Sequence, residues 1–106
     1  MERFSKYQYL RDLQTELFDM AERNQFACTD SIDDYICNSI DNAVIYTSNC
    51  YAIMMELNVY DFEFELGTAT NACQAAYYAL YEYVYDELSV YEIWEHQQST
   101  NQIVRA

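Results

Sequence analysis

Residues 71–97, NACQAAYYALYEYVYDELSVYEIWEHQ, carry the longest helical pattern in this sequence. At 100° per residue their apolar side chains fall in one stripe, and Glu82 and Asp86 lie opposite it. The stripe consists of Cys73, Ala76, Tyr77, Leu80, Val84, Leu88, Tyr91 and Trp94. We therefore expect one long helix from Asn71 to Gln97, followed by a polar tail that frays from Gln98 onward.

Two shorter patterns upstream also have helical spacing. Leu10, Leu13, Leu17 and Met20 with Ala21 predict a first helix from Phe4 to Asn24. A second helix should start at the cap residues Thr29, Asp30 and Ser31. Its buried stripe is expected to contain Ile32, Tyr35, Ile36, Ile40, Ala43 and Val44.

The second helix should break near Ile45–Thr47, where Thr47 or Ser48 can cap a short third helix that runs to Leu57. The chain has no proline and one glycine, so the turn residues that separate the strands of a sandwich or barrel are missing. We predict an all-α fold, a small domain of about four helices in which residues 1–106 form a single unit.

Residues 60–66, YDFEFEL, alternate apolar and acidic side chains with period two, which alone predicts a half-buried strand. No second strand is predicted that could pair with it. We interpret the segment as an extended acidic connector that buries Phe62, Phe64 and Leu66, with a β-edge as the alternative.

The net charge is −13, and the charges are separated along the chain. No residue from Asn24 to Val104 is lysine or arginine, although thirteen acids lie there. A negative electrostatic field of this kind disfavours binding to nucleic acid and anionic membranes and favours a cationic partner. The alternative is an acidic face that contacts only water. For a compact chain about 30–35 Å across, the charge amounts to one per ~2.5 Å, against one per ~1.7 Å of duplex DNA.

Metal and cofactor sites are not expected. The four cysteines are dispersed without a CxxC pair, and His96, expected to be exposed near a helix end, is the single histidine, which argues against zinc. Neither acidic stretch, 30–34 or 61–65, has the ligand order of a calcium loop. Dispersed cysteines without a signal peptide are typical of reduced thiols in the cytoplasm, and no apolar run is long enough to span a membrane.

No nucleophile elbow, glycine-rich phosphate loop or cysteine–histidine pattern indicates catalysis, so we predict a protein that is not an enzyme. Tyrosine is abundant instead, with twelve residues. Tyr78, Tyr81 and Tyr85 lie off the buried stripe beside Glu82 and Asp86, and tyrosine is enriched at protein interfaces. We interpret this face as a binding surface.

Three segments resemble one family, the phage Ocr (overcome classical restriction) antirestriction proteins. Residues 41–44, DNAV, are similar to the family's Asp-Asn-Ala-Val segment, and residues 60–65, YDFEFE, to its Ile-Asp-Leu-Glu-Phe-Glu. Tyr81-Glu82 and residues 88–95, LSVYEIWE, are similar to its Tyr-Glu and Leu-Thr-Ile-Asp-Leu-Trp-Glu run. The resemblance covers about residues 30–95 in consistent order.

The resemblance implies an all-helical DNA mimic that acts in the host bacterial cytoplasm and pairs into a bent homodimer. The candidate dimer contact is Tyr51, Ala52, Met55 and Glu56. Two departures bear on that contact. Ile45 stands where the family has proline, and Ala52 and Glu56 replace a larger apolar and a smaller neutral residue.

The acidic field and the resemblance together predict an inhibitor that occupies the basic DNA groove of a host DNA-binding defence protein, and the resemblance implies a type I restriction-modification enzyme as the target. The predicted phosphate surrogates are Asp30, Asp33, Asp34, Asp41, Asp61, Glu63, Glu65, Glu82, Asp86, Glu92 and Glu95. The alternatives are an immunity- or antitoxin-type protein that masks one nuclease or toxin, and an adaptor whose acidic face is only solvated.

Overall fold

The computed structural model describes residues 4–45, 47–59 and 72–103, which form five α-helices and no β-strand. The helices are α1 (Lys6–Glu22), α2 (Thr29–Ala43), α3 (Thr47–Glu56), α5 (Ala72–Glu87) and α6 (Val90–Ile103). They contain 82% of the described residues. The prediction of an all-helical fold is therefore confirmed for this part of the chain. The alternating segment at 60–66 lies outside the described residues.

Helix α1 begins and ends at residues suited to those positions. Ser5 Oγ accepts a hydrogen bond from the Gln8 N–H at 3.2 Å, so the serine is the N-cap. After the C-cap Arg23, Asn24 has a φ of 57°, a left-handed conformation that asparagine tolerates better than most residues. The first predicted helix is confirmed.

Helix α2 begins slightly earlier than its predicted cap residues, because Cys28 is the N-cap. Ser31 reaches back to it, and its Oγ accepts a hydrogen bond from the Cys28 N–H at 3.3 Å. The predicted break is also present, since α2 ends at Ala43 and α3 begins at Thr47.

The prediction of one long helix from Asn71 to Gln97 is wrong. Helix α5 ends at Glu87 and α6 begins at Val90. Ser89 Oγ accepts a hydrogen bond from the Glu92 N–H at 3.4 Å. A serine side chain that satisfies a free N–H at a helix start is an N-cap, so this hydrogen bond favours a new helix over continuation of the old one.

The break changes which side chains α6 buries. Tyr91, expected in the buried stripe, is 74% exposed, and Trp94 is only half-buried. Ile93 and Gln97 are buried instead. The predicted fraying after Gln98 is also wrong within the described residues, because α6 continues to Ile103.

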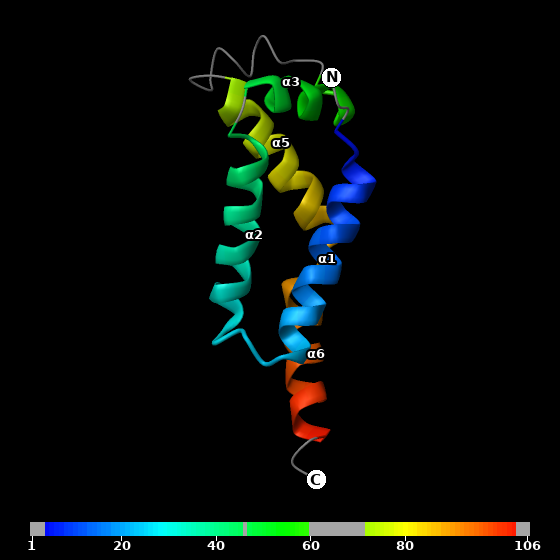
Figure 1. The fold of residues 1–106 in the computed structure, drawn as a ribbon, viewed down its shortest axis with the longest axis vertical. Coiled ribbons are helices and arrows are strands. Elements are labelled where there is room, and N and C mark those ends of the chain that lie inside the picture. The colour runs from blue at the N-terminus through cyan, green and yellow to red at the C-terminus, as the bar shows by residue number, and fades with distance from the viewer. Residues whose placement is uncertain (1–3, 46, 60–71, 104–106) are drawn as a thin grey trace.

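The helices form an elongated bundle (Figure 1). Helices α5 and α6 follow each other along its length, α1 packs beside α6, and α2 runs back between the two ends. Helix α3 lies across one end and packs on α5. The molecule measures 56 × 27 × 20 Å, and its radius of gyration of 15.9 Å exceeds the roughly 13 Å of a compact chain of this length.

The core runs through the bundle and takes aliphatic side chains from every described helix. Its fully buried members include Leu17, Ile32, Ile36, Ile40, Ile53, Leu80, Val84 and Ile93. Burial of such side chains contributes roughly 1.5–3 kcal/mol each relative to exposure. The stripes predicted for α1 and α2 therefore do face the interior.

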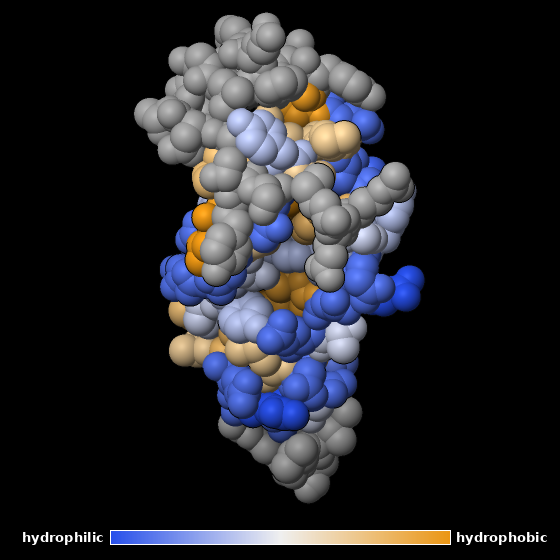
Figure 2. All heavy atoms as spheres, turned by 45° about the horizontal axis from the view of Figure 1, so that its top comes forward, coloured by the Kyte–Doolittle hydropathy of each residue, from blue (hydrophilic) through white to orange (hydrophobic). Residues whose placement is uncertain are grey.

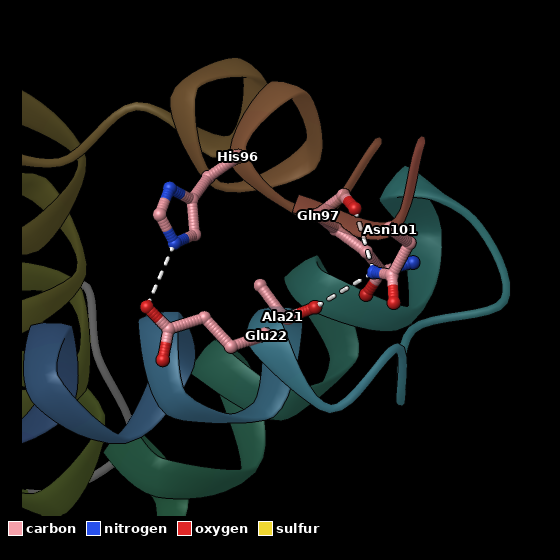
Figure 3. A network of polar contacts seen from close by, with 5 residues as sticks. All are labelled: Ala21, Glu22, His96, Gln97 and Asn101. Atoms are coloured by element: carbon pink, nitrogen blue, oxygen red, sulfur yellow. Dashed lines mark hydrogen bonds and ion pairs between the residues drawn. The ribbon is translucent and has the colours of Figure 1, made fainter. Parts of the chain in front are cut away.

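Helix α6 also holds the loop between α1 and α2 by polar contacts. The buried Gln97 accepts a hydrogen bond from the Phe26 N–H at 3.0 Å and donates one to the Phe26 carbonyl at 2.7 Å. Asn101 Nδ2 donates to the Ala21 carbonyl at 3.4 Å and to the Gln97 carbonyl at 2.7 Å (Figure 3). Gln97 thus satisfies both backbone groups of Phe26, which lies in the loop, and Asn101 connects α6 to the last turn of α1.

His96 is part of the same α1–α6 contact. Its ring packs edge-on against Phe18 at 5.1 Å, and its Nε2 lies 3.1 Å from Glu22 Oε1 (Figure 3). The prediction of an exposed histidine near a helix end is wrong, since His96 is half-buried in the middle of α6. Among the described residues, no helix is long and apolar enough to cross a membrane.

Candidate partner-binding surface

The lysines and arginines of the described residues are confined to one helix, α1, and its C-cap, and α1 also carries acids. In the described ranges every lysine and arginine lies on α1 or at its C-cap: Lys6, Arg11 and Arg23. The acids of α1 already have local partners of opposite or neutral charge, for example Asp19, whose carboxylate lies 3.2 Å from Arg23. Helices α2, α5 and α6 carry acids and no lysine or arginine. The uncompensated negative charge therefore lies on these three helices.

On α2 three of the predicted phosphate surrogates form a row. Asp30, Asp34 and Asp41 are all exposed. At 3.6 residues per turn they lie within about 40° of one another on the helix and span ~16 Å along it. The isoleucines of the core occupy the other side of α2, so the carboxylates are held outward by the packing of the helix.

The acids of the last two helices are exposed as well. Glu82 and Asp86 lie one turn apart on α5, and Glu92 and Glu95 lie on α6. The break at Ser89 separates the two pairs. Figure 2 shows hydrophilic residues over much of one face of the molecule, with smaller apolar areas between them. Asp61, Glu63 and Glu65 lie outside the described residues.

Asp33 differs from the other acids of α2. It is half-buried, and Tyr85 on α5 donates its hydroxyl hydrogen to Asp33 Oδ1 at 2.7 Å. Burial, and then the Asp33 hydrogen bond and charge, raise the pKa of the Tyr85 hydroxyl. Asp33 thus joins two helices and is less available to a partner than its neighbours.

Tyr85 belongs to a row of tyrosines on α5 that lies along α2. The rings of Tyr77 and Tyr81 are 6.1 Å apart and stacked, and those of Tyr81 and Tyr85 are 4.6 Å apart. Burial raises the pKa of Tyr77, with further contributions from Cys37 and Asp41 of α2. We call this contact, formed by Asp33, Cys37 and Asp41 with Tyr77, Tyr81 and Tyr85, the α2–α5 seam.

The sequence pattern did not lead us to predict the seam, although its residues recur every fourth position on α2 and every fourth position on α5. The pattern placed Tyr78, Tyr81 and Tyr85 on one binding face. Tyr78 is 54% and Tyr81 38% exposed, whereas Tyr85 turns toward α2. A surface pocket of 290 Å³ lies at the Tyr77 end of the seam. Its lining comprises Asp41, Val44, Cys73, Gln74, Tyr77 and Tyr78.

The candidate dimer residues on α3 divide into two kinds. Tyr51 is 48% and Met55 77% exposed, and one turn of helix separates them. Ala52 is half-buried, and Glu56 accepts a hydrogen bond from the backbone N–H of Lys6 at 3.2 Å. Glu56 therefore connects α3 to the start of α1.

The elongated shape lowers the charge density that a compact chain would have. Thirteen net negative charges over 56 Å give about one per 4.3 Å, against one per ~1.7 Å of duplex DNA. The expected spacing of ~2.5 Å is wrong because it assumed a compact chain.

The described residues contain no group of three or more histidine, cysteine or acidic side chains placed to hold a metal ion.

Comparisons with protein families, curated proteins and solved structures found no match to this chain.

Proposed function

We propose that this protein is a non-catalytic, Ocr-like DNA mimic that occupies the basic DNA groove of a host defence protein, with a type I restriction-modification enzyme as the expected target. The supporting observation is the separation of charge: exposed acids on α2, α5 and α6, and every described lysine and arginine on or beside α1. Lysines and arginines that grip phosphates would pair with these carboxylates.

The rigidity of the scaffold also supports competition with DNA. The carboxylates of α2 extend from a helix whose opposite side is fully buried, so little conformational entropy is lost on binding. Because many acids share the contact, neutralising one should have little effect, and neutralising six or more should abolish inhibition. A single substitution that eliminated inhibition in a folded protein would contradict this distributed contact.

Two variants with equal net charge provide the test. One replaces Asp30, Asp34, Glu82 and Asp86 with their amides. The other variant replaces four acids of α1 with their amides: Asp12, Glu16, Asp19 and Glu22. Both would be expressed in bacteria with a type I restriction system, and the plating efficiency of unmodified phage would be measured. We expect the wild type and the α1 variant to protect the phage, and the first variant, which loses four of the proposed acids, to protect it markedly less, with circular dichroism confirming that both variants fold.

If the two folded variants lost protection of the phage equally, total charge would matter rather than the proposed surface. If the wild type gave no protection, the restriction enzyme would be refuted as the target. Binding to the purified enzyme should also weaken steeply with salt and be displaced by duplex DNA.

A masking protein for one nuclease or toxin is the second candidate, and the exposed Tyr78 and Tyr81 favour it. A few tyrosines would then dominate binding. The two functions differ in breadth: a mimic binds unrelated DNA-binding proteins, and a masking protein binds one.

We further propose that two copies pair through α3. Exposed Tyr51 and Met55 offer the apolar contact, and sedimentation of the wild type against Met55→Glu tests it. We expect a dimer that the substitution converts to monomer; a monomeric wild type refutes the pairing.

A further inference from the structure

The pocket at the Tyr77 end of the seam combines an acid with aromatic side chains. Asp41 and Val44 come from the end of α2, and Cys73, Gln74, Tyr77 and Tyr78 from the first two turns of α5. The rings of Tyr77 and Tyr78 are 5.9 Å apart and nearly perpendicular, at 88°. Two ring surfaces and one carboxylate therefore border one concave space.

Asp41 occupies an electrostatically unfavourable position. It lies in the last turn of α2, where the carbonyl ends of the helix dipole favour cations, and that turn contains no basic residue. The negative charge of Asp41 and the negative end of the helix are thus added together beside the pocket. A bound cation would relieve both.

The protein binds one of its own cations in a similar arrangement. Lys6 Nζ lies 5.3 Å from the centroid of the Tyr7 ring and 5.8 Å from that of Tyr83. Both distances are within the ~6 Å over which a ring attracts a cation. Glu56 Oε2 accepts a hydrogen bond from the Lys6 backbone N–H at 3.2 Å, so a carboxylate lies beside this residue as well. The pocket contains the same kinds of group, tyrosine rings and a carboxylate. None of its lining residues is a lysine or an arginine.

We propose that this pocket binds one arginine side chain of a protein partner, with the guanidinium against the Tyr78 ring and paired with the Asp41 carboxylate. Arginine suits the site better than lysine because its planar group stacks on aromatic rings and forms two parallel hydrogen bonds to a carboxylate. The inference rests on the proposed function in one respect: a DNA-binding partner would supply the arginine. It adds a defined anchor to a contact otherwise spread over many acids.

The probe is N-acetyl-arginine methylamide, titrated into the full chain while the tyrosine ring signals are followed by NMR. The citrulline analogue, which has the same shape without the charge, is the matched control ligand. We expect saturable shifts of the Tyr77 and Tyr78 signals with the arginine probe, weaker binding of the lysine analogue, and none with citrulline.

The variants Tyr78→Leu and Asp41→Asn should each weaken the probe about 3- to 10-fold. Tyr78→Phe keeps the ring and should bind normally. Tyr91→Leu and Asp12→Asn remove an exposed ring and an exposed acid elsewhere and should leave probe binding unchanged. Citrulline binding equal to arginine, non-saturable shifts across the acidic surface, or equal weakening by the control variants would each overturn the proposal.

The two proposals fail separately. Probe binding without phage protection would leave the pocket in place and refute the restriction inhibitor. Phage protection without probe binding would refute the pocket and leave the distributed acidic contact.

Discussion

The hydroxyl of Tyr85 on α5 donates a hydrogen bond of 2.7 Å to the Asp33 carboxylate on α2. A hydrogen bond to a charged group contributes about 1.5–3 kcal/mol when it is sheltered from water. Tyr85→Phe should therefore lower the free energy of unfolding by about 1–2 kcal/mol, measured by urea denaturation. Tyr81→Phe is the control, and equal stability of the two variants would show that the Asp33 contact contributes nothing.

Several tyrosines of the bundle should make the folded protein less stable in alkali. Burial, together with a hydrogen bond to Glu16, raises the pKa of Tyr35 to about 12 from its ordinary value of 10.0, and Tyr85 shifts in the same direction. The unfolded chain loses these protons first as the pH rises, so the folded state holds more protons and its stability declines between about pH 10 and 12. Below pH 10 the contribution is fully present.

The urea midpoint at successive pH values measures this decline, and absorbance of ionised tyrosine measures the titration itself. Tyr35→Phe should make the decline shallower in that window. If the midpoint fell equally in the variant and the wild type, ionisation of Tyr35 would not be responsible.

Gln97 is buried and satisfies both backbone groups of Phe26. Gln97→Leu would leave a buried N–H and a buried carbonyl without partners, and we expect a loss of about 2–4 kcal/mol. The half-buried neighbour Gln98 provides the control, since Gln98→Leu should change stability little. Similar thermal midpoints for both variants would contradict the role assigned to Gln97.

The four cysteines should differ in reactivity toward a thiol reagent. Cys28 is exposed and should react first. Cys50 is buried, its Sγ lies 3.0 Å from that of Cys73, and burial raises the pKa of its thiol to about 12. Cys50 should therefore react last in the folded protein, as peptide mass analysis would measure, and the difference should vanish in denaturant. Early modification of Cys50 would mean that α3 separates from α5.

The sequence was informative about helix faces and less so about helix ends. The stripe of Leu13 and Leu17 fixes the inner side of α1 because burial follows the helical period. The same period gave the wrong result across Leu88, since Leu88 is buried whether or not the helix continues, and the stripe itself contains no sign of a break. The Ser89-x-x-Glu92 spacing, which is typical of a helix start, was the available signal.

The candidate site was predictable to a similar extent. The outward position of Asp30, Asp34 and Asp41 follows from their helical phase alone. The engagement of Asp33 does not, because it depends on the register between α2 and α5. Burial of Gln97 was likewise beyond the sequence pattern, since a glutamine is ordinarily assigned to the solvent side and its Phe26 partner is far away in the chain.

The packing of α1 against α6 has a consequence for the newly made chain. During translation about 70 residues separate the end of α1 from the start of α6, so at ~5–20 residues per second the apolar side of α1 lacks its partner for several seconds. Leu13, Leu17 and Ala21 are the buried residues of that side. Helix α1 is thus completed by a helix made much later, and the emerging chain must keep this side from premature association until then.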